Sequence, residues 1–382
     1  DELYETFPIE IPGGDHVIIN SSTAPIIYSK GSSLLRQING YIGKKNFQEG
    51  LQHYLKMHQY DCASSHHLWE AFEAVSDRPV KNMVHQWIKQ PGFPLVETRR
   101  NKNRLTLSQK RFTYLPETSE AVWPIPVILE IFSEKGDSHQ QVLMLEQQTQ
   151  TFDLAPETAA VKVNAGQTGF YRTYYPKTAD LEALGHLVKK KALGPEDRWG
   201  LQNDLFSLVR ANIKPFDSYL TFLAFYEEED AYLPLSSIDA NLFFAYLVLD
   251  KTWQNTTAEK GRSLAEKILD RIGYTPKPDE PQTITMLREQ MLWHMVVYGH
   301  EGVMGFAEEQ FDMLVKGESI HPDITKSIMQ VSAFMGGNVA FEWLCQRLEK
   351  TDSEHERMNI LMALGCFSET ALIKNAARYT LD

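Results

Sequence analysis

Tyr28 is the side chain whose position most favours a chemical role, because it stands immediately before a predicted helix. Apolar residues from Leu34 to Ile42 recur at intervals of three and four, which predicts one buried helix face, and Gly43 suits the C-terminal cap. A phenol hydroxyl can donate a hydrogen bond to negative charge that develops during a reaction. Position alone is a weak argument, since the sequence has 16 tyrosines and most tyrosines are core or surface residues.

The sequence lacks two histidines spaced as zinc ligands on one helix. Two His-Glu pairs begin at His300 and His355, but Met304 and Asn359 occupy the positions four residues after these histidines. Neither residue can complete the two-histidine face that zinc needs.

His66 and Glu70 are the only other residues with ligand-like spacing, because they would share a helix face. Ser64 and Ser65, just before them, are natural N-cap residues. The stretch therefore favours an exposed first helical turn over a metal site.

Five ordered motifs nevertheless resemble one known family, the zinc aminopeptidases of the aminopeptidase N type. Four of them resemble the second half of that family's catalytic domain, and the last resembles the strand pair that closes its β-sandwich. The motifs contain Tyr28, Lys30, Gly31 and Arg36; Gly43, Phe47, Gly50 and Tyr54; Leu68, Trp69 and Glu70; Trp87, Gln90, Gly92 and Pro94; and Asn164, Gly169, Tyr171 and Arg172.

The resemblance implies a role for Tyr28. In the family, the tyrosine at this position donates a hydrogen bond to the oxyanion that forms when zinc-bound water attacks the first peptide bond. One such donor lowers the barrier by roughly 2.7–4 kcal/mol. The resemblance also implies peptide substrates, and it places Thr23 where the family often has an aromatic residue that lines the pocket for the substrate's first side chain.

The family's zinc-binding motif and its amine-recognition loop are absent from this sequence. Residues 1–9 resemble the segment that links the zinc helices to the tyrosine turn. We therefore expect a C-terminal portion of a zinc aminopeptidase, in which zinc belongs to the full-length enzyme and a missing N-terminal half supplies it. The isolated chain is expected to bind no catalytic zinc and to be inactive.

A second hypothesis remains open, because some relatives of this family have lost the metal site. The chain would then be a non-catalytic scaffold or peptide-binding module. A third hypothesis is that the chain is a generic helical adaptor. This hypothesis explains residues 177–382 but does not explain the family-like motifs before them.

The elements that would position Tyr28 predict a multidomain α+β chain with three domains. Residues 1–91 read as the helical C-terminal lobe of a thermolysin-like catalytic domain, in which Asn46 and Glu49 predict a capping box at the start of the second helix. This lobe ends at Gln90, where prolines and a glycine follow.

Residues 92–176 predict a small β-sandwich of six or seven strands, because apolar residues alternate with polar ones. Gly166 and Gly169 are expected to supply turn conformations that return Phe170 and Tyr171 alongside the strand at Val161 and Val163. Asn164 and Arg172 favour a turn-stabilising pair over a binding site.

Residues 177–382 predict a C-terminal α-helical solenoid, an aminopeptidase C-terminal-like domain that we expect to be incomplete. Thr256 and Glu259 predict the start of one helix, which Gly273 ends. In the resembled family such a domain encloses a peptide-binding cavity.

The composition of the sequence argues against nucleic acid and membranes as partners. A net charge of −12 without a basic stripe argues against nucleic acid, and the longest strongly apolar run, Ala240 to Leu249, is too short to cross a bilayer. Three scattered cysteines predict neither a disulfide framework nor a zinc finger, which favours the cytoplasm.

Overall fold

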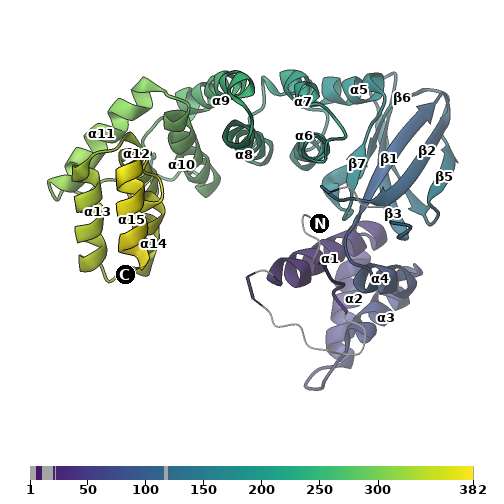
Figure 1. The fold of residues 1–382 in the computed structure, drawn as a ribbon. Coiled ribbons are helices and arrows are strands. Elements are labelled where there is room, and N and C mark those ends of the chain that lie inside the picture. The colour runs from purple at the N-terminus through teal and green to yellow at the C-terminus, as the bar shows by residue number, and fades with distance from the viewer. Residues whose placement is uncertain (1–5, 11–19, 22, 116–118, 382) are drawn as a thin grey trace. The chain divides into compact units, whose positions relative to one another are not determined.

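The computed structural model describes residues 6–10, 20–21, 23–115 and 119–381 (Figure 1). The chain divides into two compact units, Asp1–Glu229 and Asp230–Asp382. The predicted domain boundaries after residues 91 and 176 both fall within the first unit and stay predictions. Most of the segment 1–9 lies outside the described residues.

The first unit opens with helices, in the order η1 (Pro25–Ser29), α1 (Lys30–Ile42), α2 (Lys44–Met57), α3 (Ser65–Ser76) and α4 (Val80–Lys89). Ile38 in α1, Phe72 in α3 and Trp87 in α4 are fully buried. Two predicted ends are confirmed: α1 stops at Gly43, whose φ is 83°, and α4 stops before Gln90. Gly43 suits this conformation because it has no Cβ.

The predicted start of the second helix at Asn46 is wrong. α2 begins at Lys44, directly after Gly43. The Asn46 side chain instead donates a hydrogen bond of 2.8 Å to the carbonyl of Ile42, one of the unpaired carbonyls at the end of α1. Asn46 therefore satisfies the C-terminus of one helix and not the N-terminus of the next.

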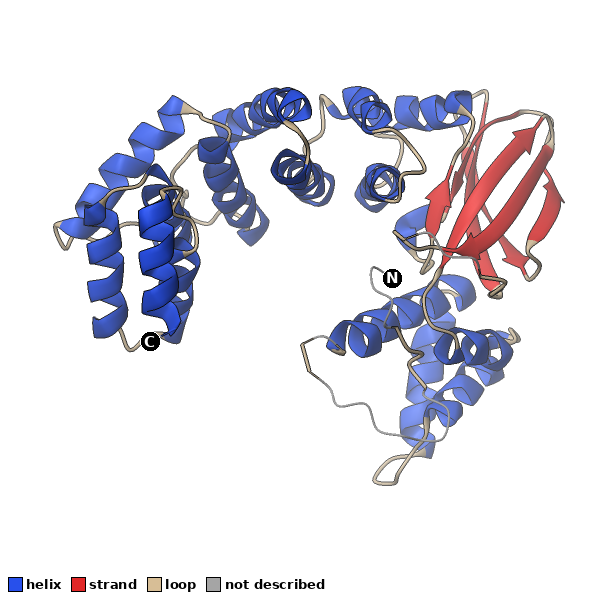
Figure 2. Ribbon diagram, in the orientation of Figure 1, coloured by secondary structure: helices blue, strands red, loops and turns tan. Residues whose placement is uncertain are grey.

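Two small sheets follow (Figure 2). One has the strand order β5-β2-β1-β7 and the other β4-β3-β6. The strands are β1 (Pro94–Asn101), β2 (Arg104–Arg111), β3 (Ile125–Ser133), β4 (Ser138–Leu145), β5 (Thr149–Asp153), β6 (Thr158–Val163) and β7 (Arg172–Tyr174). The alternation predicted around Leu105 and Leu107 is confirmed, since both are buried in β2.

The predicted return of the chain beside Val161 and Val163 is wrong. β6 pairs with β3, whereas β7 pairs in parallel with β1 in the other sheet. The glycines also differ from expectation. Gly166 has a φ of 67° and belongs to the turn η2 (Ala165–Gln167), but Gly169 is not in the left-handed region. A Cβ on Gly169 would lie 2.1 Å from the Tyr171 ring, so close packing explains this glycine.

The remaining described elements are helical. The first unit continues with α5 (Thr178–Lys189), α6 (Pro195–Arg210), α7 (Phe216–Phe222) and η3 (Leu223–Tyr226). The second unit contains α8 (Tyr232–Val248), α9 (Lys251–Ile272), α10 (Gln282–Val297), α11 (Glu301–Val315), α12 (Pro322–Met335), α13 (Asn338–Lys350), α14 (Glu354–Leu364) and α15 (Thr370–Leu381). A helical part, two small sheets and a long run of helices make the chain an α+β multidomain protein, as predicted.

The start predicted for α9 at Thr256 is wrong, although its end at Gly273 is confirmed. α9 begins at Lys251, because the Asp250 side chain accepts hydrogen bonds from the backbone of Thr252 and Trp253. In the second unit α12 packs against both α10 and α14 around one apolar cluster. Across the described residues, the search for a helix with the length and hydropathy of a membrane span finds none.

Candidate functional site

Tyr28 lies in η1, a single π-helical turn that leads into α1. Its side chain is 62% exposed, which is unusual for a large aromatic residue in this chain. π-Helical turns are rare and occur frequently at functional sites. The structure thus places Tyr28 at the entrance of a helix, exposed to solvent.

Lys30, two residues after Tyr28, fixes the start of α1. Its ammonium group is buried and donates hydrogen bonds to the carbonyls of Gln90 (2.6 Å) and Gly92 (3.0 Å). Gln90 in turn donates from its side chain to the carbonyl of Val122 (3.1 Å). The motif that contains Tyr28 and the motif that ends α4 therefore meet through one lysine.

The environment of Lys30 disfavours its charged form. Burial, with a smaller contribution from the nearby positive charge of Arg111, lowers the pKa of Lys30 to about 8. The two carbonyl acceptors hold the Lys30 side chain in place although burial disfavours its charged form. The sequence prediction did not identify this anchor, because the partners of Lys30 lie about 60 residues further along the chain.

Thr23 lies before the π-helical turn and is partly buried. Its hydroxyl accepts a hydrogen bond from the Asn20 backbone (2.9 Å), and the Asn20 side chain accepts one from the Thr23 backbone (3.1 Å). This reciprocal pair resembles a capping box and orders the approach to η1. Thr23 thus lies just before the short turn that contains Tyr28.

The face of α1 holds a second anchor. Arg36 donates to the carbonyls of Gly166 (2.9 Å) and Gln167 (3.1 Å), and the Gln37 side chain accepts from the Phe170 backbone (2.9 Å). These contacts join two of the motifs recognised in the sequence. The loop between β6 and β7 therefore positions α1, the helix that follows Tyr28.

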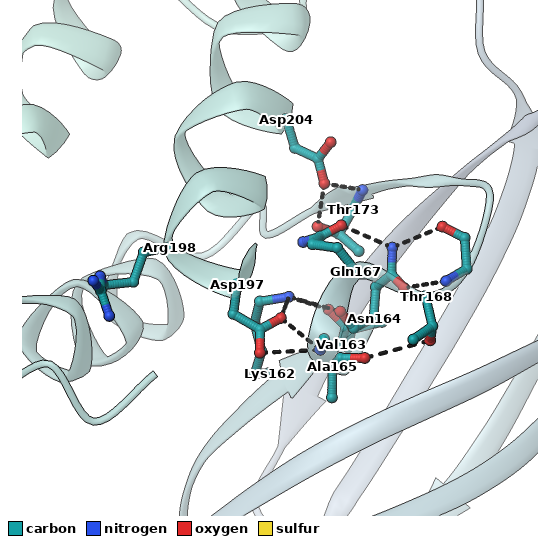
Figure 3. Close-up of polar contacts among 12 residues, drawn as sticks. Lys162, Val163, Asn164, Ala165, Gln167, Thr168, Thr173, Asp197, Arg198 and Asp204 are labelled. Atoms are coloured by element: carbon teal, nitrogen blue, oxygen red, sulfur yellow. Dashed lines mark hydrogen bonds and ion pairs between the residues drawn. The ribbon is translucent and has the colours of Figure 1, made fainter. Parts of the chain in front are cut away.

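That loop is held by a buried polar network. Figure 3 shows Asp197 and Asp204 projecting from α6 toward the segment 162–173. Asp197 pairs with the fully buried Lys162 (3.1 Å), and its two carboxylate oxygens share the Gly166 backbone N–H (2.9 and 3.0 Å). Its place in the first turn of α6 also suits a negative charge.

Asn164 and Arg172 do not pair with each other, contrary to the sequence prediction. The Asn164 side chain bonds to the backbone of Gly169 and to Gln167, which confirms its structural part in the turn. Arg172 instead pairs with Asp204 (3.2 Å). Asp204 also accepts from the Thr173 backbone and hydroxyl (2.9 and 2.8 Å).

The histidines considered as metal ligands from the sequence make local contacts. The Ser64 backbone donates to the ring of His67 (3.2 Å), which makes His67 part of the capping box that starts α3. His66 and Glu70 form the predicted pair on one helix face, at 3.3 Å. The ring of His300 caps α11, and that of His355 lies 3.3 Å from the Asn359 amide.

No group of three or more histidine, cysteine, aspartate or glutamate side chains is arranged to hold a metal ion in the part of the chain that the structure describes. The side chains gathered around α1 are a phenol, an ammonium and a guanidinium. These groups donate hydrogen bonds or oppose negative charge, and they are not ligands that zinc prefers.

Comparison with known proteins adds two family matches. Residues 4–87 match the peptidase family M1 domain, and residues 160–382 match the ERAP1-like C-terminal domain. The second match covers more than half of the chain. Both matches follow the order of the motifs recognised in the sequence.

Several curated proteins are similar to the whole chain at low identity. Aminopeptidase M1 of Arabidopsis thaliana is 27% identical, and the aligned region covers 100% of this chain and 46% of the relative. The puromycin-sensitive aminopeptidase of Caenorhabditis elegans is 27% identical, with 41% of its length covered. The alanine/arginine aminopeptidase of Saccharomyces cerevisiae is 27% identical, with 45% covered.

The chain thus spans a little under half the length of these relatives. M1 peptidases are zinc-dependent, and the described residues of this chain hold no candidate zinc site. The order of the motifs, the two family matches and the full coverage of this chain agree: it belongs to the M1 aminopeptidase family and joins part of the peptidase M1 domain to an ERAP1-like C-terminal domain.

Proposed function

We propose that this chain supplies the oxyanion-stabilising tyrosine of a zinc aminopeptidase that removes N-terminal residues from peptides. Tyr28 is the donor, and residues outside this chain supply zinc and the glutamate base. The observation that carries the proposal is the exposed phenol on a π-helical turn whose next turn is anchored by Lys30. Zinc, when bound, would polarise the carbonyl and lower the pKa of its water.

The anchors explain how a surface tyrosine can be catalytically useful. An oxyanion donor works only when it is placed before the charge develops, because reorientation during the reaction would raise the barrier. Lys30 fixes the N-terminus of α1, and Arg36 and Gln37 fix its face. Lys30 is therefore a positioning residue in this proposal, and Tyr28 is the catalytic one.

The rest of the chain has a supporting role in the proposal. The two sheets act as a sandwich-like spacer, and the helices from α5 onward form a solenoid that encloses peptides. Thr23 would line the pocket for the substrate's first side chain, close to the turn that carries Tyr28. The three free cysteines agree with a reducing compartment such as the cytoplasm.

The test combines this chain with a zinc-bearing M1 segment that restores hydrolysis of an aminoacyl chromogenic substrate. Replacing Tyr28 with Phe removes only the hydroxyl and is expected to lower kcat about 10²–10³-fold, with zinc content unchanged. Tyr60→Phe is the matched control, because Tyr60 is also exposed and lies in the same unit. Equal rates for the two variants would refute the role of Tyr28.

The alternative proposal, a non-catalytic scaffold, makes a different prediction in the same experiment. Peptide binding would persist, but no zinc-bearing M1 segment would restore hydrolysis. A restored rate that depends on Tyr28 excludes the scaffold as the main function.

A further inference from the structure

Three of the described helices begin with a backbone N–H that donates to a histidine ring. The acceptor is Nδ1 of His67 at α3 (3.2 Å), of His300 at α11 (3.1 Å) and of His321 at α12 (3.3 Å). A ring nitrogen accepts a hydrogen bond only while it carries no proton. An imidazole gains its second proton between about pH 8 and 5, so each of these helix starts contains a titratable acceptor.

Protonation of such a ring disturbs the start of a helix in two ways. It removes the acceptor of a backbone N–H, and the first N–H groups of a helix have no partner within the helix. It also places a positive charge at the positive end of the helix dipole, where a cation is unfavourable. How strongly each helix responds therefore depends on the charges around its histidine.

A carboxylate lies beside the ring at α11 and at α12. Nε2 of His300 is 3.7 Å from a carboxylate oxygen of Glu266, and the ring of His321 is 3.7 Å from the carboxylate of Asp323. A negative charge at this distance favours the charged ring. The new ion pair therefore offsets the lost hydrogen bond in both helices.

His67 lies against a second histidine instead. Its ring stacks on that of His58, with centroids 4.4 Å apart and planes inclined by 12°. His58 ends α2, and the C-terminus of a helix favours a positive charge, whereas the N-terminus of α3 opposes one on His67. Tyr54 lies 5.5 Å from His58, and the side chain of Asp61 in the connecting loop accepts from the Cys62 backbone (2.7 Å).

The other charged groups around the pair do not supply a free carboxylate. Glu70, one turn along α3 from His67, is shared by Lys81 of α4 (3.2 Å) and by His66 (3.3 Å). The hydrogen bond from Lys81 lowers the pKa of the Glu70 carboxyl, so Glu70 stays charged while histidines titrate. Glu73 also pairs with Lys81 (3.8 Å).

We propose that His67 makes the start of α3 an acid-sensitive cap. Above about pH 7 the neutral ring accepts from the Ser64 backbone and stacks on His58. Below about pH 6 protonation breaks this hydrogen bond and brings two positive rings face to face, so the first turn of α3 separates from the end of α2. This property goes beyond the proposed function and does not depend on it.

The change is confined to the start of α3. Phe72, two turns along the helix from Ser65, is fully buried and stacks on Phe47 of α2, with ring centroids 4.8 Å apart. This apolar contact contains no group that titrates. The rest of the packing between α2 and α3 therefore persists, and the opening is reversible.

Hydrogen exchange of the full chain, followed by mass spectrometry at pH 7.5 and 5.5, tests the proposal. Rates are divided by the intrinsic exchange rates at each pH, which gives protection factors. We expect the protection factors of residues 65–70 to fall about tenfold at pH 5.5 and to recover at pH 7.5. Those at the starts of α11 and α12 should change less than about twofold, so the unaltered chain contains its own comparison.

Three variants assign the response to one ring. His67→Gln keeps an acceptor at the position where capping boxes use glutamine, and it should abolish the dependence on pH. His66→Gln is the matched control, because His66 is the adjacent histidine and pairs with Glu70, and it should keep the full response. His58→Gln removes the repulsion between two charged rings and should reduce the loss of protection.

Several outcomes would overturn the proposal. Protection at the start of α3 that is equal at the two pH values would show that the cap does not respond to acid. An equal loss at the starts of α3, α11 and α12 would indicate general acid unfolding. A His67→Gln variant that loses as much protection as the unaltered chain would assign the response to other groups.

Discussion

The junction between the sheets and α6 differs from the second unit in how its elements are held together. At the junction, a strand, a loop and a helix meet through buried charges, with Lys162 on Asp197 and Arg172 on Asp204. In the second unit, the helices pack mainly around one continuous apolar cluster, and the buried pairs Arg288–Glu280 and His294–Asp239 lie beside it. Ion pairs and hydrogen bonds fix direction as well as distance, whereas apolar packing fixes mainly volume.

This difference matches what each region has to do. The junction positions the loop that accepts Arg36 and holds α1, so a small rotation there would move Tyr28. The described helices of the second unit are held mainly by the apolar cluster. We therefore expect isosteric changes of charge to be harmful at the junction and changes of apolar side chains at constant volume to be tolerated in the second unit.

The largest expected effect is at Asp197. Asp197→Asn preserves shape but leaves the buried Lys162 without its counter-charge, and such losses destabilise by about 3–5 kcal/mol. Hydrogen exchange followed by mass spectrometry should show faster exchange in β6 and at the start of α6. Exchange rates equal to those of the parent would mean that the ion pair is not what fixes the junction.

The stability of the second unit should depend on the volume of its buried apolar side chains. Leu344 is fully buried in the apolar cluster, so Leu344→Ala is expected to destabilise it by about 2–5 kcal/mol. Leu344→Met keeps the volume and should change stability by less than about 1.5 kcal/mol. Urea unfolding of the pair measures the difference, and similar losses for both variants would contradict the contrast with Asp197.

Lys30 gives a pH-dependent effect near the proposed site. Its pKa is lowered to about 8 in the folded chain from an ordinary value of 10.5, so between these values the unfolded chain binds more protons. Stability contributed by this group therefore rises with pH in that window, by about 1–2 kcal/mol from pH 8 to 9.5. Lys30→Met should lack this rise when urea midpoints are compared at the two pH values. An equal rise in the variant would assign the effect to other groups.

The smallest effect concerns the start of α9. Asp250→Ala removes the side chain that accepts from Thr252 and Trp253, and the loss of such a cap costs about 1 kcal/mol. Exchange should increase in the first turn of α9 only. A change that spreads through the second unit would show that the cap also supports the apolar cluster.

The sequence predicted the local features of the fold well. Gly43 and Gly273 end helices as expected, because a positive φ after an apolar periodic run is a local requirement. Helix starts were less predictable: Asn46 and Thr256 carry N-cap chemistry, but Gly43 and Asp250 provide the actual starts. The side chain of a capping residue forms a hydrogen bond with a nearby unpaired backbone group. That group can belong to the end of one helix or to the start of the next.

Contacts between segments far apart in the chain could not be predicted from the pattern of apolar and polar residues. The alternation at Val161 and Val163 predicts a strand but does not specify its partner, and the chain that follows it forms β7, which pairs with β1. The position of Tyr28 followed from its motif, but the anchor at Lys30 did not, since the Gln90 and Gly92 carbonyls that it binds carry no side-chain signal. The sequence shows which group could act, and the tertiary structure shows what holds it.

The most direct test of the account is the rate of the reconstituted zinc enzyme with Tyr28→Phe beside Tyr60→Phe. We predict that kcat falls about 10²–10³-fold for the first variant and is unchanged for the second, with equal zinc content. A Tyr28→Phe enzyme that retains the parental kcat would contradict the account.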